Sequence, residues 1–178
     1  MSRLELPIHR SVSFVLVRPH YPENVGACAR ALKTMGFSDL VLVKPSRLAV
    51  PEHEMAFKMA VRSWDVLHAA RRTETLEQAV HGVDLVVATS SHRGISGVLT
   101  ARQAAREIVR RSAGGERSAV LFGNEKTGLA AEELSGAGLC LRIPMVADQP
   151  SINLAQAVQL VAYELFIAAL EARSGAAP

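Results

Sequence analysis

Residues 154–173 place the strongest constraint on the fold, because they predict a helix that is apolar on nearly every side. Leucine, valine, isoleucine, phenylalanine and alanine fill most positions, and only Gln156, Gln159 and Tyr163 form a polar stripe. A helix without a wide polar face is buried on more than one side. The fold must therefore cover this helix on more than one side.

A short strand and a polar loop precede this helix. Residues 139–143 are apolar and end in a β-branched residue, and Pro144 stops the strand because it cannot donate to a ladder. The loop leads to Ser151, the expected N-cap. Small polar groups and backbone amides thus meet the start of a buried helix, where α/β proteins bind ligands. An ordinary cap on a core helix explains this segment equally well.

The rest of the chain alternates between strand and helix patterns. Strands are expected at residues 12–17, 40–43, 84–88, 118–122 and 139–143, and helices at 25–35, 52–64, 76–80, 100–112 and 130–134. This alternation is typical of an α/β fold with a mostly parallel sheet flanked by helices. Because 178 residues suffice for one good core, we expect a single domain over residues 1–173 and a disordered tail over 174–178.

Composition narrows the class of protein. The longest apolar run falls short of a membrane span, and the N-terminal residues lack the apolar core of a signal peptide. Cys28 and Cys140 are far apart and the six histidines are scattered, so we expect a cytoplasmic protein with no membrane contact and no metal site. A formal net charge of +3 hints at an anionic partner.

Three of the expected strands end in small polar or glycine-containing loops, at residues 89–90, 123–125 and 143–145. Ligands in open α/β sheets gather outside the carboxyl ends of the strands, so these loops should share one crevice. The dinucleotide fingerprint, the P-loop and the nucleophile elbow are all absent from the sequence. Backbone amides, small hydroxyls and apolar walls suit an uncharged heteroaromatic ring and a ribose better than a polyphosphate.

Three sequence motifs lie at the expected strand–loop–helix junctions. They are PENVGACAR at residues 22–30, LFGNEKTGL at 121–129, and IPM at 143–145 followed by PSINLA at 150–155. In this order they resemble the three motifs of the SpoU-type (TrmH) RNA 2′-O-ribose methyltransferases of the SPOUT superfamily, over essentially the whole chain. The third motif has Ile152 where leucine is usual, which keeps an apolar side chain. The resemblance implies a C-terminal deep trefoil knot, S-adenosylmethionine as the cofactor, and a homodimer.

The resemblance also implies roles for single residues. Those implied to hold the cofactor are Thr89, Ser90, Gly123, Ile143, Met145, Ser151, Ile152 and Asn153. Arg30 is implied to serve the acceptor hydroxyl. Because a guanidinium with a pKa above about 12 stays protonated, we expect Arg30 to bind the adjacent phosphate and lower the pKa of the hydroxyl, not to act as a general base. Asn24 and Glu125 are implied to orient Arg30 and the loops. Without the motifs, Asn24 would be taken as a helix N-cap and Glu125 as a surface charge.

The implied activity is methylation of an RNA ribose, and the most similar branch modifies position thirty-two of the tRNA anticodon loop. A ribosomal-RNA methyltransferase and a non-catalytic RNA-binding protein of the same fold are alternatives. A small-molecule O-methyltransferase is disfavoured by the motifs and by a pI of about 9.2. On the helix expected at residues 100–112, Arg102, Arg106 and Arg110 either follow RNA phosphates or form a solvated face.

Overall fold

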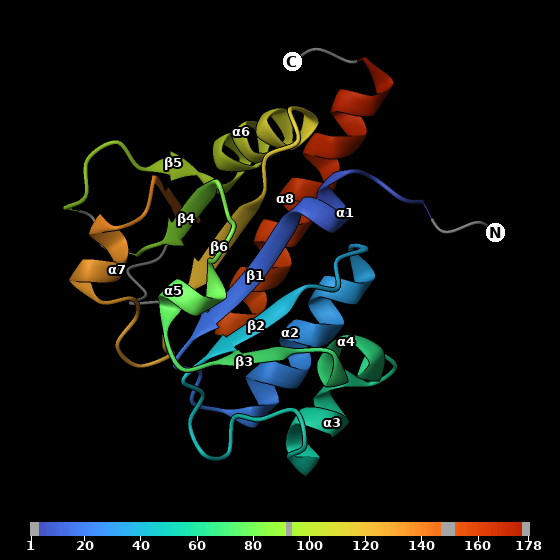
Figure 1. Cartoon of the computed structure of the whole chain (residues 1–178), viewed down its shortest axis with the longest axis vertical. Helices are drawn as coiled ribbons and strands as arrows, with labels where there is room; N and C mark the ends of the chain where they lie inside the picture. Colours follow the sequence, from blue (N-terminus) through green and yellow to red (C-terminus); the bar gives the residue numbers. More distant parts are fainter. Residues whose placement is uncertain (1–3, 92–93, 147–151, 176–178) are drawn as a thin grey trace.

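A computed structural model describes residues 4–91, 94–146 and 152–175. Its centre is a seven-stranded sheet in the order β3-β2-β1-β6-β4-β7-β5, and every strand pair is parallel (Figure 1). The strands are β1 (Val12–Val17), β2 (Leu40–Val43), β3 (Arg71–Thr73), β4 (Leu85–Thr89), β5 (Leu99–Thr100), β6 (Ser118–Phe122) and β7 (Leu139–Arg142). The expected parallel α/β fold is confirmed.

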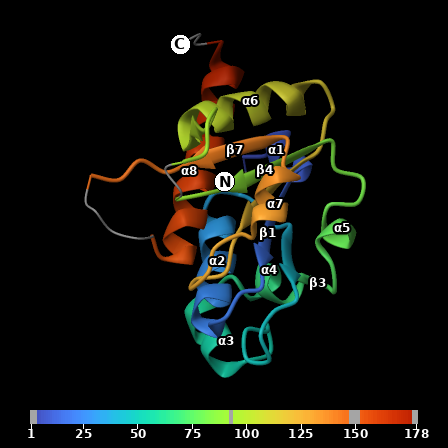
Figure 2. The same cartoon turned by 90° about the vertical axis from the view of Figure 1, so that its left-hand side faces the viewer.

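Helices cover both faces of the sheet. They are α1 (Ile8–Ser11), α2 (Pro22–Thr34), α3 (Glu54–Ala60), α4 (Trp64–His68), α5 (Leu76–Ala79), α6 (Ala101–Ala113), α7 (Ala131–Ser135) and α8 (Leu154–Ser174). The long helices α2, α6 and α8 lie on one face, and the short helices α5 and α7 lie on the other (Figures 1 and 2). The two layers bury the sheet on both sides, as its continuous apolar strands predict.

Two separate cores follow from the alternation of side chains along each strand. In β1, Phe14 and Leu16 point into the core beneath α2, α6 and α8, whereas Val15 and Val17 join the smaller core beneath α5 and α7. Every residue of β1 and β6 is buried. These central strands therefore hold the loops at their carboxyl ends on a rigid base.

Helix α8 packs against α2 and α6 and contributes to the larger core along its whole length. Its 21 residues are long and apolar enough to cross a membrane by length and composition alone, contrary to the expectation that no apolar segment would reach that length. Its outer side remains open, because Leu160 and Tyr163 are 42% and 46% exposed. Within one chain, α8 is therefore covered on two sides and bare on a third.

Several boundaries differ from the sequence expectation. The helix expected at residues 52–64 is two helices, α3 and α4, because the chain turns at Val61 with a φ of 53°. The side chains of Phe57, Val61 and Trp64 are exposed instead of facing inward. Ser151 lies outside the described residues, and the N-cap of α8 is Asn153. The elements α1, β3 and β5 were not expected from the sequence.

Gly26 fixes the approach of α3 to α2. A Cβ at this position would lie 2.0 Å from the carbonyl oxygen of Ala56 in α3. Backbone cannot move aside as a flexible side chain can, so only glycine permits this contact. The first motif therefore contains a packing glycine in addition to its expected functional residues.

Gly26→Ala should destabilise the protein by about 1–3 kcal/mol, the usual cost of overpacking. Alanine in place of a helical glycine ordinarily stabilises by about 0.5–1 kcal/mol, so the two effects have opposite signs. Urea denaturation followed by circular dichroism measures the change. Gly94→Ala is the control, because a Cβ at Gly94 meets no atom within 4 Å. A stabilised Gly26→Ala variant would contradict the close approach of the helices.

Candidate active site

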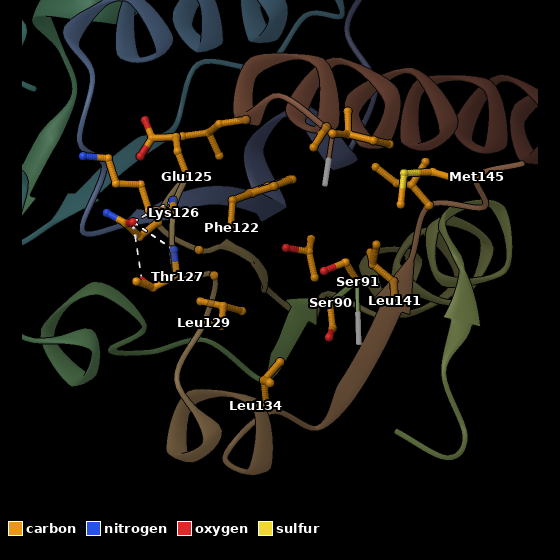
Figure 3. Close-up of a pocket in the computed structure, with 18 residues that line it drawn as sticks. Ser90, Ser91, Phe122, Glu125, Lys126, Thr127, Leu129, Leu134, Leu141 and Met145 are labelled. Carbon is orange, nitrogen blue, oxygen red and sulfur yellow. Dashed lines mark hydrogen bonds between the residues drawn. The ribbon is translucent and has the colours of Figure 1, made fainter. Parts of the chain in front are cut away.

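A cavity of about 290 Å³ opens at the carboxyl ends of β4, β6 and β7 (Figure 3). The loops of the second and third motifs form most of its wall. The residues expected to hold a cofactor that line it are Thr89, Ser90, Gly123, Ile143, Met145 and Ile152. Of the other two, Asn153 lines a neighbouring hollow, and Ser151 is outside the described residues. The structure thus brings three strand ends together at one crevice.

The walls of the cavity are largely apolar. The apolar side chains that line it include Phe122, Leu129, Leu134, Leu141 and Leu154. Thr89 lies at the end of β4, and its hydroxyl donates to the carbonyl oxygen of Leu121 at 2.9 Å. This bond ties the end of β4 to β6, so the hydroxyl hydrogen of Thr89 is already engaged.

The loop after β6 is closed on itself. Asn124 and Gly128 exchange two backbone hydrogen bonds of 3.2 and 2.8 Å. A Cβ on Gly123 would lie 2.2 Å from the carbonyl carbon of Gly128, so this position accepts only glycine. The side-chain oxygen of Asn124 also accepts from the backbone N–H groups of Lys126 and Thr127, at 2.9 and 3.2 Å. The second motif is therefore a preformed loop.

Glu125 joins this loop to the start of α2. Its carboxylate accepts hydrogen bonds from the backbone N–H groups of His20 and Tyr21, at 2.8 and 3.2 Å, and from the side-chain amide of Asn24 at 2.9 Å. The N-cap of α2 is Tyr21, and Asn24 lies inside the helix. The N-cap interpretation of Asn24 is therefore wrong: its buried side chain bonds to Glu125.

The same network continues into the third motif. The side-chain amide of Asn153 donates to the side-chain oxygen of Asn24 at 3.0 Å. The side-chain oxygen of Asn153 accepts from the N–H groups of Ala155 and Gln156, at 3.0 and 3.3 Å, and caps α8. Glu125, Asn24 and Asn153 thus connect all three motifs through two side-chain hydrogen bonds, which join residues 101 and 129 positions apart in the sequence.

Arg30 lies apart from this network. It is exposed on α2 and lines a broad hollow between α2 and α8, together with Asn153, Gln156 and Ile152. Within the described residues, no hydrogen bond joins Arg30 to Asn24 or Glu125. The hydrogen bonds of Asn24 and Glu125 join the β6 loop, the start of α2 and Asn153 instead.

The first motif also contains Cys28, whose thiol is a candidate nucleophile. It is completely buried, and burial raises the pKa of its thiol above the ordinary value, helped by the negative charge of Glu125. A protonated, buried thiol is not a nucleophile. Among the described residues, no group of three or more His, Cys, Asp and Glu side chains could hold a metal ion.

The arginine stripe on α6 is occupied by ion pairs. Arg102 makes two hydrogen bonds of 3.0 and 3.1 Å with Glu164 of α8. Arg106 lies 3.8 Å from Glu171, and Arg110 pairs with Glu107 at 2.7 Å. Neighbouring carboxylates therefore offset these charges, which favours the solvated-face interpretation over a track for phosphates.

Sequence reasoning missed some residues around the cavity. Asn124, which closes the loop, and Lys126, which lines the cavity, both lie inside the second motif. His20 and Tyr21 directly precede the first motif. Their position beside recognised motifs was the available signal, but their contacts depend on the folding of the β6 loop against the start of α2.

Comparisons with known proteins agree with this geometry. A model of the SpoU rRNA Methylase family matches residues 11–163. The chain is 37% identical to the uncharacterized tRNA/rRNA methyltransferase LasT of Escherichia coli K12, over 86% of this chain and 67% of that protein. It is 38% identical to the tRNA (cytidine/uridine/adenosine-2′-O-)-methyltransferase TrmJ of Pseudomonas aeruginosa, over 91% and 63%. The chain thus spans about two thirds of the length of these curated relatives.

Solved structures show the same fold. A probable methyltransferase from Bordetella pertussis superposes with a TM-score of 0.83 at 34% identity, covering 89% of this chain and 93% of that one. TrmJ from Z. mobilis gives a TM-score of 0.79 at 34% identity, covering 88% and 69%. The AdoMet complex of the SpoU methyltransferase AviRb from Streptomyces viridochromogenes, at 17% identity, gives 0.69, covers 93% and 59%, and supports the fold alone.

Asn24→Ala should lower the free energy of unfolding by about 1–3 kcal/mol, because it removes one of the three donors to Glu125 and the acceptor of the Asn153 side-chain amide. Urea denaturation measures the loss. Gln156→Ala is the control: it removes an exposed side-chain amide from α8, and we expect a change within about 0.5 kcal/mol. Equal stability of Asn24→Ala and the wild type would show that the network contributes nothing.

Proposed function

The chain belongs to the SpoU rRNA methylase family, and on this premise we propose that it transfers a methyl group from S-adenosylmethionine to a ribose 2′-hydroxyl of RNA. The observation that supports this most is the hydrogen-bonded series Glu125–Asn24–Asn153. It joins the three family motifs around one cavity at the strand ends.

The cavity suits the proposed cofactor chemically. Apolar walls from Leu129, Leu134 and Leu141 can enclose an adenine ring, and the backbone around Gly123 and Ile143 offers polar groups at the rim. About 290 Å³ is near the lower end of the range for small-molecule pockets, roughly 300–1,000 Å³. Thr89, Ser90, Met145 and Ile152, which line the cavity, would complete the site. Ser151 and Asn153 of the third motif remain proposed cofactor-binding residues.

Bound S-adenosylmethionine supplies a methyl group already activated by its sulfonium. The protein's task is then to hold the ribose hydroxyl in line with that methyl group, since positioning is a large part of catalysis. Arg30 would contact the phosphate next to the acceptor ribose, and its fixed positive charge would lower the pKa of the hydroxyl. The hydroxyl proton would pass to solvent, because Arg30 stays protonated and cannot accept it.

We propose tRNA as the RNA substrate. Relatives at 34–38% identity include several tRNA 2′-O-methyltransferases named TrmJ. Another structural neighbour, described as dealing with 2-OH methylation of C/U34 on tRNA, has 26% identity and a TM-score of 0.71. A ribosomal-RNA substrate is the second candidate, because a neighbour at 26% identity is an AdoMet-bound rRNA methyltransferase.

We also propose a homodimer with a C-terminal trefoil knot, working in the cytoplasm. The exposed Leu160 and Tyr163 on α8 support the dimer, because both are large side chains left uncovered within one chain, and Leu160 lines the hollow that contains Arg30. In the related family, this arginine approaches the cofactor of the partner subunit. The position of Arg30 outside the cavity of its own chain is consistent with that arrangement.

Arg30→Ala should leave the affinity for S-adenosylmethionine within a few-fold of wild type and reduce methyl transfer to RNA at least about a hundredfold. Isothermal titration measures the cofactor affinity. Mapping of ribose methylation on total RNA from cells with and without the protein identifies the RNA substrate, on which the rate of methyl transfer is then measured. Arg117→Ala is the control, since Arg117 is exposed at the amino end of β6. A wild-type protein that binds no cofactor would refute the proposed activity, and near-normal turnover of Arg30→Ala would refute the role of Arg30.

Two inactive variants should restore activity when mixed, if each site uses both subunits. Arg30→Ala removes the side chain proposed to hold the acceptor RNA, and Ser90→Trp should fill the cofactor cavity. After random exchange half of the dimers are mixed, and each mixed dimer has one intact site, so about a quarter of wild-type activity should return. Native mass spectrometry confirms the exchange. No recovery after confirmed exchange would show that each chain builds its own site.

A further inference from the structure

Lys126 occupies the end of the cavity opposite Met145 (Figure 3). Its ammonium nitrogen lies 2.9 Å from Nε2 of His20 and 5.4 Å from the centre of the Tyr21 ring. A histidine nitrogen and an aromatic face both hold a cation in place. Neither group carries the negative charge that would neutralise it.

Many lysine and arginine side chains among the described residues form ion pairs with carboxylates, and Lys126 does not. Carboxylates lie within 4 Å of Lys33, Lys58 and most of the described arginines. Lys126 forms no ion pair with any described residue. The neighbouring Glu125 directs its two oxygens to three N–H donors at the start of α2.

A second loop brings further positive charge to this place. Ser46, an uncharged residue in the loop after β2, fixes this loop to the segment that contains His20. Its N–H donates to the carbonyl of Pro19 and its hydroxyl donates to the carbonyl of His20, both at 2.9 Å. Arg47 follows in the same loop, is exposed, and has no ion pair within the described part of the chain. The loop after β1 is thus tied to the loop after β2 through Ser46 and to the loop after β6 through Lys126. We call His20, Arg47 and Lys126, one residue from each of these loops, the basic rim.

We propose that the basic rim binds backbone phosphates of the RNA strand that flanks the methylated nucleotide. This inference rests on the proposed function, because the strand must leave the cavity over one of its edges. The rim borders the cavity at Lys126, and neither Lys126 nor Arg47 has an ion pair with a described residue. Positive charge that is free of carboxylates is the chemistry that recognises a polyanion. The arginines on α6 are already paired with glutamates and lack this property.

The test measures the salt dependence of binding to a fluorescein-labelled tRNA transcript by fluorescence anisotropy. Each phosphate contact that is lost should reduce the slope of log K against log salt by about 0.7–0.9. We expect Lys126→Gln to reduce the slope by about one contact, and Lys126→Gln with Arg47→Gln by about two. Lys126→Arg should restore the wild-type slope, because it keeps the charge.

Lys58→Gln is the matched control. It removes the same charge from the same residue type, but Lys58 is paired with Glu54 on α3 at 2.6 Å. Its slope should equal that of the wild type. If Lys126→Gln and Lys58→Gln change the slope equally, only net charge matters and the rim is refuted.

Titration with S-adenosylmethionine separates the remaining outcomes. A loss of cofactor affinity above about tenfold in Lys126→Gln, with an unchanged slope, would assign Lys126 to the cofactor and overturn the inference. If Lys126→Gln reduces the slope while the wild-type protein binds RNA but methylates none, the rim is supported and the proposed activity is refuted. Failure of the rim and failure of the proposed function therefore give different results.

Discussion

The site depends on the hydrogen bonds that the carboxylate of Glu125 accepts. This carboxylate is half-buried, and its oxygens accept three hydrogen bonds from the segment that starts α2. A hydrogen bond to a charged group contributes about 1.5–3 kcal/mol, roughly twice a neutral one. The negative charge also lies at the N-terminus of a 13-residue helix, where the helix dipole favours it. One side chain thus fixes the β6 loop and the entry to α2 together.

Asn24 transmits this constraint to the C-terminal helix. Because Asn24 donates to Glu125 and accepts from Asn153, its amide must keep one orientation, and Asn153 is then free to cap α8 with its oxygen. The start of α8 separates the cavity from the hollow that contains Arg30, and Ile152 lines both. A methyl donor in the cavity and an acceptor ribose beside Arg30 would therefore be positioned by the same hydrogen-bond network.

The sequence was sufficient to predict an element where a local pattern of residues determines the structure. The strands at 12–17, 40–43 and 118–122 were correct because continuous apolar runs with β-branched residues leave few alternatives. It failed where tertiary contacts decide. The turn at Val61 interrupts a helical pattern, and β3 consists of Arg71, Arg72 and Thr73, which no hydrophobic period identifies as a strand. The motifs located the cavity, but only the fold shows that Asn24 serves Glu125 and not its own helix end.

The distribution of ion pairs explains how a modest net charge can still direct a polyanion. On α6, Arg102 and Arg106 face Glu164 and Glu171 of α8, so their charges join two helices. Exposed pairs of this kind stabilise little, about 0–1 kcal/mol each, but they leave no field for a distant ligand. Lys126 and Arg47, by contrast, lie on loops at the strand ends without a described carboxylate partner. Part of the net charge of +3 therefore lies beside the cavity at Lys126, where it raises the local positive potential.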